Sequence, residues 1–147
     1  MRIISFDPGG TTGVAAYDED AWKYGGELWT FQSLGPEEHH EDLWVCLDGF
    51  KTIVYERFNY QRRELDKGVS LRLDSVEYIG VIKLFAQQNY DVTLHPQQPA
   101  DRLFWDDDKL RKLSLWRSSP HERDAVRHLL TYVSFKLKDQ RFIMQLK

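Results

Sequence analysis

The apolar residues near the start of the chain occur in short blocks that predict three strands. These blocks are Arg2–Phe6, Gly13–Tyr17 and roughly Tyr24–Gln32. Short connections, two of which contain glycine, favour antiparallel pairing of consecutive strands. The chain therefore begins with a pattern typical of an antiparallel three-stranded unit.

After this unit, helical and strand patterns alternate. The spacing of apolar residues predicts a helix, a strand that ends at Glu56, a polar loop, a second helix, a fifth strand, two short helical pieces and a long final helix. Their expected ranges are Pro36–Phe50, Thr52–Tyr55, Arg57–Arg72, Leu73–Asn89, Asp91–His95, Pro99–Phe104, Asp106–Ser114 and Pro120–Lys138. This order predicts an α/β domain with a mixed five-stranded sheet, the first three strands antiparallel, flanked by helices.

The length of 147 residues fits a single domain over 1–147. The one cysteine, Cys46, has no internal disulfide partner, which fits a reducing cytoplasm. The pattern shows neither a signal peptide nor a membrane span, so we expect a cytoplasmic protein without membrane contact, in the host cytoplasm if it is phage-encoded.

The charge is distributed unevenly along the chain, although the net charge is only −3. Residues 1–50 hold 2 basic and 10 acidic side chains, and residues 51–147 hold 18 basic and 13 acidic ones. Such asymmetry is compatible with a polyanionic partner and equally with an ordinary solvated surface.

Asp7 is the first candidate for chemistry. It ends an apolar strand and precedes a glycine-containing turn, residues 8–13. An ionised carboxylate beside a buried strand is tolerated when it is paired or binds a metal. A turn former without a functional role is the alternative interpretation for an Asp before Pro-Gly. We expect a metal or phosphate site at this end of the sheet.

Glu56 and the start of the final helix supply the other candidates. Glu56 also ends an apolar strand, and His121 and Asp124 lie three apart at the beginning of the helix, on one face. His128 follows Asp124 by four residues and is a candidate to support the ligands. Grouped carboxylates repel one another unless a proton or a cation separates them, so a hard divalent ion and phosphoryl chemistry are indicated.

These motifs, in this order, resemble the RuvC-like Holliday junction resolvases of the ribonuclease H-like nuclease superfamily, and most of all its compact phage-type members. The matching segments are the strand and turn of residues 3–13, the strand end Val54–Glu56, and the helix start His121–Ala125. The resemblance implies a ribonuclease H-like fold and an endonuclease that cleaves branched DNA by two-metal hydrolysis, usually as a homodimer. It implies that Asp7, Glu56, His121 and Asp124 are catalytic and bind two Mg²⁺ or Mn²⁺ ions per active site.

The resemblance also implies a set of DNA-binding residues. These are the aromatic residue Phe58 or its alternative Tyr60, which would stack on a base, and the basic residues Arg62, Arg63, Lys67, Arg102 and Lys109, which would contact phosphates. Core packing is the alternative for Phe58, and a solvated loop is the alternative for Arg62, Arg63 and Lys67. The acidic run Asp106–Asp108 departs from the family pattern beside Lys109, and we interpret these acids as solvated turn residues.

Three other functions remain open on the sequence. A nuclease of the same fold that cuts flaps, forks or RNA–DNA hybrids would use the same acids. The turn after Asp7 also resembles the phosphate loop of actin-like ATPases, although those enzymes need two lobes. A metal-free module that kept the fold is the third possibility, and the presence of a competent ligand at all four positions argues against it.

Overall fold

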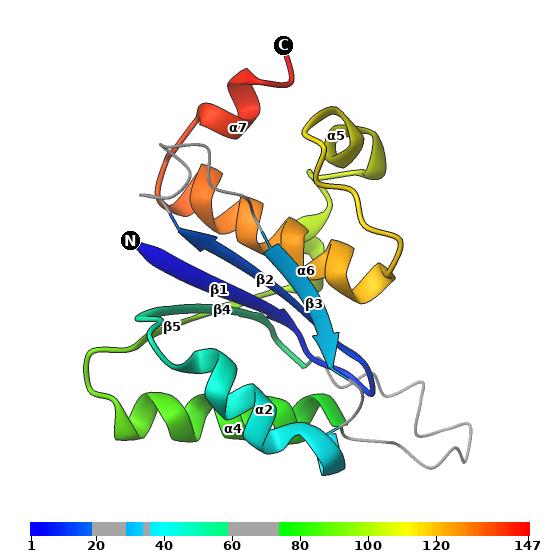
Figure 1. Cartoon of the computed structure of the whole chain (residues 1–147). Helices are drawn as coiled ribbons and strands as arrows, with labels where there is room; N and C mark the ends of the chain where they lie inside the picture. Colours follow the sequence, from blue (N-terminus) through cyan, green and yellow to red (C-terminus); the bar gives the residue numbers. More distant parts are fainter. Residues whose placement is uncertain (19–28, 34–35, 59–73) are drawn as a thin grey trace.

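The computed structural model describes residues 1–18, 29–33, 36–58 and 74–147. They form a layered α/β structure, which confirms the predicted class (Figure 1). The strands are β1 (Arg2–Asp7), β2 (Thr12–Asp18), β3 (Trp29–Ser33), β4 (Thr52–Glu56) and β5 (Thr93–Gln97). The helices are α2 (Pro36–Leu47), α4 (Asp74–Gln88), α5 (Asp107–Lys112), α6 (Pro120–Thr131) and α7 (Arg141–Met144), with a 3₁₀ turn η1 (Pro99–Arg102) and a π-helical turn η2 (Tyr132–Lys136).

The five strands form one mixed sheet in the order β3-β2-β1-β4-β5. The pairs β1–β2 and β2–β3 are antiparallel, whereas β1–β4 and β4–β5 are parallel. Because Phe6 of β1 pairs with Tyr55 of the parallel strand β4, the next residues, Asp7 and Glu56, emerge at the same edge of the sheet. This register places the two acids at the same end of the sheet's parallel strands.

Helices cover both faces of the sheet (Figure 1). Alternate residues of β1 point to opposite faces, so that Ile3 belongs to the core beneath α6 and Ile4 to the core beneath α2 and α4. Both side chains are fully buried. The core on the α6 side also holds Trp105 and residues of α7, which ties the C-terminal third of the chain to the sheet.

Several element boundaries differ from those that the sequence predicts. The fifth strand extends through Pro96, which was expected to end it, and Pro96 is tolerated because β5 lies at the edge of the sheet. The expected final helix to Lys138 is α6 followed by the π-helical turn η2. The helix α7 has no counterpart in the prediction. Residues 24–28 of the expected third strand and most of the expected loop lie outside the described residues.

Two expectations about composition can be compared with the structure. Cys46 is partly buried and packs against the core on the α2 and α4 side, as an apolar residue would. Among the described residues, none of the helices combines the length and apolar character needed to cross a membrane.

Candidate active site

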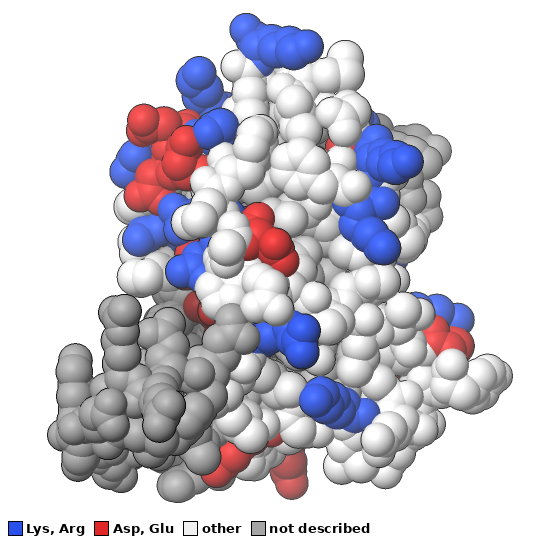
Figure 2. Space-filling model, turned by 180° about the vertical axis from the view of Figure 1, so that it is seen from behind, with Lys and Arg blue, Asp and Glu red and all other residues white. Residues whose placement is uncertain are grey.

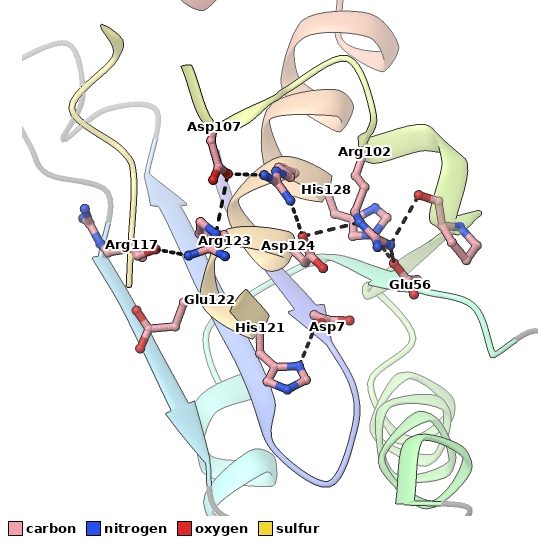
Figure 3. Close-up of polar contacts among 12 residues, drawn as sticks. Asp7, Glu56, Arg102, Asp107, Arg117, His121, Glu122, Arg123, Asp124 and His128 are labelled. Atoms are coloured by element: carbon pink, nitrogen blue, oxygen red, sulfur yellow. Dashed lines mark hydrogen bonds and ion pairs between the residues drawn. The ribbon is translucent and has the colours of Figure 1, made fainter. Parts of the chain in front are cut away.

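Asp7 and His121 meet at the edge of the sheet, although they are 114 residues apart in sequence. Asp7 ends β1, and His121 lies in the first turn of α6 (Figure 3). His121 Nδ1 lies 3.0 Å from Asp7 Oδ2. The helix begins here because the Ser119 hydroxyl caps it and Pro120 occupies its first turn. The capping residues that fix the start of α6 therefore also determine the position of the His121 imidazole.

Gly13 makes this approach of α6 possible. A Cβ atom built on Gly13 would lie 2.0 Å from the backbone oxygen of His121 and 2.6 Å from the backbone nitrogen of Glu122. Only a residue without a side chain fits between β2 and the start of α6. Gly13 also pairs with Asp7 across β1 and β2. The absence of a side chain at Gly13 thus lets the start of α6 pack directly against β2, beside Asp7.

Asp7 is in an environment that opposes its ionisation. Burial raises the pKa of Asp7 from 3.8 to about 6, and the nearby charges of Glu56 and Asp124 contribute to the rise. The hydrogen bond to His121 acts in the opposite direction. The side chain is only 12% exposed. The three carboxylates are therefore close enough to repel one another, as the sequence predicts.

Glu56 is held by a buried histidine. His128 Nε2 lies 2.7 Å from Glu56 Oε2, and His128 Nδ1 lies 2.6 Å from Gln97 Oε1. Gln97 in turn donates from its amide nitrogen to the backbone oxygen of His128 at 3.1 Å. Burial acts to raise the pKa of Glu56, but hydrogen bonding and the positive charges of His128 and Arg102 lower it overall. Glu56 is accordingly fixed in its ionised form.

Arg102 lies between Glu56 and Asp124 (Figure 3). Its Nη1 is 2.5 Å from Glu56 Oε2, and its Nε is 3.4 Å from Asp124 Oδ1. Asp124 also accepts a hydrogen bond from Arg127 Nη1 at 2.7 Å. The side chains of Glu56 and Asp124 are 19% and 18% exposed. Two of the four predicted ligands are thus neutralised by arginine in this structure.

A second group of ion pairs links α5 to α6. Arg127 bonds both Asp124 and Asp107, and Arg123 Nε lies 3.6 Å from Asp107 Oδ1. Asp106 caps α5 by accepting from the Lys109 backbone nitrogen at 2.9 Å. The interpretation of this acidic run as solvated turn residues is therefore wrong for Asp107, which anchors the arginines behind Asp124. Asp108, with a side chain 90% exposed, does fit that interpretation.

The four predicted ligands match a divalent ion in composition, since three carboxylates and one imidazole suit Mg²⁺ or Mn²⁺. The raised pKa of Asp7 reflects burial and repulsion that a cation would relieve. Within the described ranges, however, no three His, Cys, Asp or Glu side chains are already arranged to hold an ion. The residues fit the metal chemically, although Glu56 and Asp124 contact Arg102 in this structure.

The predicted DNA-binding residues have different surroundings. Phe58 is partly buried, packs against the core on the α2 and α4 side, and lines a cavity of about 300 Å³ together with Glu56 and Arg102. Lys109 Nζ lies 2.5 Å from Asp106 Oδ2 and 5.0 Å from the ring centre of Phe104, so it is engaged within the protein. Tyr60, Arg62, Arg63 and Lys67 lie outside the described residues. On the face shown in Figure 2, Lys and Arg are interspersed with Asp and Glu.

Comparison with solved structures places this arrangement among known folds. RuvC of T. thermophilus, in complex with a Holliday junction substrate, matches with a TM-score of 0.59 and 16% identity, over 94% of this chain and 96% of RuvC. The Holliday junction resolvase of fowlpox virus matches with a TM-score of 0.59 and 13% identity, over 91% of this chain and 98% of its own. The likeness shows the fold. This chain shares the fold of these two resolvases across nearly its whole length. No protein-family model matches the sequence, and neither does any curated protein.

Sequence reasoning anticipates some residues of the site and misses others. His128, expected to support the ligands, does so by bonding Glu56. Arg102 was expected at DNA phosphates, but it contacts the carboxylates. Gln97 belongs to no motif of the sequence, although it directly follows Pro96 at the end of the edge strand. Its polar side chain at the end of the strand beside β4, which carries Glu56, is the signal that could have indicated its role.

Proposed function

We propose that this chain is a divalent-metal-dependent endonuclease that cleaves branched DNA, such as Holliday junctions, by hydrolysing phosphodiester bonds. The observation that carries the proposal is the meeting of Asp7, Glu56, His121 and Asp124 at one edge of the sheet. Asp7 contacts His121, and Arg102 bridges the other two. The fold of the two resolvases supports it, since both are named for action on four-way junctions.

The proposed roles follow from the geometry of the site. Asp7, Glu56, Asp124 and His121 would hold Mg²⁺ or Mn²⁺ ions, two per site. Such ions supply water activation at neutral pH and stabilise charge on the leaving oxygen. His128 and Gln97 hold Glu56 in a fixed orientation, which preserves the geometry that hydrolysis needs. Phe58 lines the adjacent cavity, where an unpaired base would stack on its ring.

Three substrates separate the proposed activity from its nearest alternative. A four-way DNA junction, a flap and an RNA–DNA hybrid, each end-labelled, are incubated with the protein in Mg²⁺ and in Mn²⁺. We expect cleavage of the junction in preference to the other two, with 5′-phosphate and 3′-hydroxyl products. Preferential cleavage of the flap or the hybrid would assign the same site to the alternative nuclease function.

A pair of Asp→Asn variants tests whether the proposed site performs the cleavage. Asp7→Asn removes a proposed metal ligand and is expected to abolish cleavage. Asp91→Asn is the matched control: Asp91 is exposed, pairs with Lys51 and precedes β5, whose other end lies beside Glu56. Cleavage that survives in Asp7→Asn at the wild-type rate would refute the assignment of the site.

We further propose that the chain acts as a homodimer. A four-way junction has two symmetry-related strands to cut, and two copies of one active site match that symmetry. Light scattering coupled to size-exclusion chromatography, with and without a junction, measures the assembly. A single copy on a junction that is cut in both strands would contradict the dimer.

A further inference from the structure

The guanidinium of Arg102 occupies the position between two proposed metal ligands. Arg102 ends η1, Glu56 ends β4 and Asp124 lies in α6, so three separate elements converge on this contact. Arg102 also donates from Nη1 to the Pro99 backbone oxygen at 3.4 Å. Its side chain is 26% exposed, which leaves it open to solvent on one side.

These contacts meet an electrostatic need of the metal-free protein. Glu56 and Asp124 are both largely buried and lie near the third acid, Asp7. A partly buried carboxylate without a counter-ion destabilises the folded state. Removing the cation from a buried ion pair is therefore strongly destabilising, because the carboxylate stays behind with its charge uncompensated. Arg102 contacts Glu56 and Asp124 together, as no other cation does in the part of the chain that the structure describes.

Arg102 and a divalent ion compete for the same oxygens. A carboxylate that binds a metal ion has less negative charge to offer a guanidinium, and two cations on one oxygen repel. A guanidinium keeps its positive charge in proteins, so Arg102 cannot resolve this conflict by losing a proton. It therefore has to move away when a metal ion binds Glu56 and Asp124.

The adjacent cavity gives the released guanidinium a destination. Arg102 lines this cavity of about 300 Å³ together with Arg57, Phe58 and Ser75. Glu56 lines it as well, so the cavity opens directly beside the proposed metal ligands. A guanidinium presents a planar fork of donors that matches two oxygens of a phosphate. A DNA phosphate at this position would lie next to both the acids and the arginine.

We propose that Arg102 is an exchangeable counter-ion, which holds Glu56 and Asp124 together in the metal-free protein and passes to a DNA phosphate when divalent ions bind. The inference rests on the proposed function, because it requires a metal site and a phosphate substrate. In this role Arg102 opposes metal binding in the absence of DNA. A residue that only contacted a DNA phosphate would not have this effect.

Metal titration without DNA tests the first half of this proposal. Mn²⁺ is titrated calorimetrically into the wild type, Arg102→Ala and Arg102→Lys. We expect Arg102→Ala to bind Mn²⁺ about tenfold more tightly and Arg102→Lys to lie between, since an ammonium makes a single-point contact. Arg2→Ala is the control, because Arg2 is an exposed arginine that pairs with Asp18 at the other end of β1 from Asp7. Its affinity should stay within twofold of the wild type.

Thermal unfolding gives an independent readout of the same exchange. In EDTA, Arg102→Ala should unfold about 6 °C below the wild type, because Glu56 and Asp124 lose the cation that they share. Saturating Mn²⁺ should remove most of that difference. If Arg102→Ala does not fold, Arg102→Lys retains a charge and its affinity decides the result. Unchanged or weaker Mn²⁺ binding in the variants would overturn the counter-ion role.

DNA binding tests the second half. Affinity for a fluorescent four-way junction is measured in EDTA and in Ca²⁺, a hard divalent ion. Arg102→Ala should lose about tenfold in affinity in Ca²⁺ and less than twofold in EDTA. Equal losses in both would show a permanent phosphate contact and overturn the exchange. Failure of the proposed function looks different, since the wild type would then bind neither Mn²⁺ nor the junction.

Discussion

His128 and Glu56 form a partly buried hydrogen bond between α6 and β4, although they are 72 residues apart in sequence. The imidazole is fully buried, and Gln97 occupies its other nitrogen. A carboxylate that is hydrogen-bonded to a buried histidine has little freedom to change its orientation. This relationship fixes the orientation of Glu56 among the proposed ligands.

Substitution of His128 should therefore affect both stability and cleavage. His128→Ala leaves a cavity and removes the partner of Gln97 Oε1, which should lower the free energy of unfolding by about 2–4 kcal/mol. Cleavage of a junction should fall about 10–100-fold, mainly in kcat, because Glu56 loses its support. Urea denaturation and steady-state kinetics measure the two effects.

A second histidine gives the matched control for this change. His95 is partly buried and its Nε2 contacts the Tyr132 hydroxyl at 3.1 Å, outside the site. His95→Ala should cost stability without a comparable loss of kcat. Equal effects of the two substitutions on kcat would mean that His128 acts through the fold alone.

Asp7 should make the stability of the metal-free protein depend on pH. Burial and then Glu56 raise its pKa from 3.8 to about 6 on folding. The folded state thus keeps a proton that the unfolded chain releases, so the free energy of unfolding should fall as pH rises from about 4 to 6. The full effect is roughly 2–3 kcal/mol. Glu56 has a lowered pKa and acts in the opposite direction, losing its contribution as pH falls below its ordinary value of 4.5.

Denaturation in EDTA at a series of pH values measures this dependence. Above about pH 5 the contribution of Asp7 should dominate, and Asp7→Asn should remove the slope between pH 5 and 6. Asp91→Asn should leave the slope unchanged, since the pKa of exposed Asp91 is lowered by its hydrogen bond with Lys51. A wild-type stability that rises across this interval would contradict the raised pKa.

Asp107 should influence the site through the arginines that it binds. Arg127 contacts both Asp107 and Asp124, so loss of Asp107 leaves Arg127 with one partner and frees it to shift Asp124. Asp107→Ala should reduce cleavage about three- to tenfold and stability by about 1 kcal/mol, since the pair is partly exposed and screened by solvent. Cleavage assays and urea denaturation measure the change.

Asp108→Ala is the control for this prediction, because Asp108 neighbours Asp107 but is almost fully exposed and pairs only at the surface with Arg111. Its effects should lie within about 0.5 kcal/mol and twofold in rate. If both substitutions changed the cleavage rate equally, the contact of Asp107 with Arg127 would not contribute to cleavage.

The sequence predicts the strands of the sheet and the two acids at their ends, because these depend on short-range patterns. The apolar blocks of β1 and β4 and the terminal positions of Asp7 and Glu56 can be inferred locally, whereas the parallel pairing of β1 with β4 is seen only in the structure. The start of α6 follows from Ser119 and Pro120, which are local capping signals. The placement of His121 near Asp7 follows once that helix is docked on the sheet.

The partners of the acids cannot be inferred in the same way. Whether Arg102 faces DNA or the carboxylates depends on the turn η1 and on electrostatic neutralisation within the fold, not on its sequence neighbours. His128 has the spacing of a helical neighbour of Asp124, yet the crossing of α6 over the sheet directs it to Glu56. Pro96 looks like a strand terminator until the sheet order shows that β5 is an edge strand.

Gly13 should be intolerant of any side chain. The Cβ of Gly13→Ala would lie within about 2 Å of the His121 backbone, so the start of α6 must move away from β2. We expect a loss of about 3 kcal/mol in the free energy of unfolding and a much weaker contact between His121 and Asp7. Urea denaturation and Mn²⁺ titration measure both effects.

Gly80 in α4 is the matched control, because a Cβ there meets nothing within 4 Å. Gly80→Ala should stabilise the protein by about 0.5–1 kcal/mol through its helix propensity. A stable Gly13→Ala variant with unchanged Mn²⁺ affinity would show that α6 does not need this close approach to place His121.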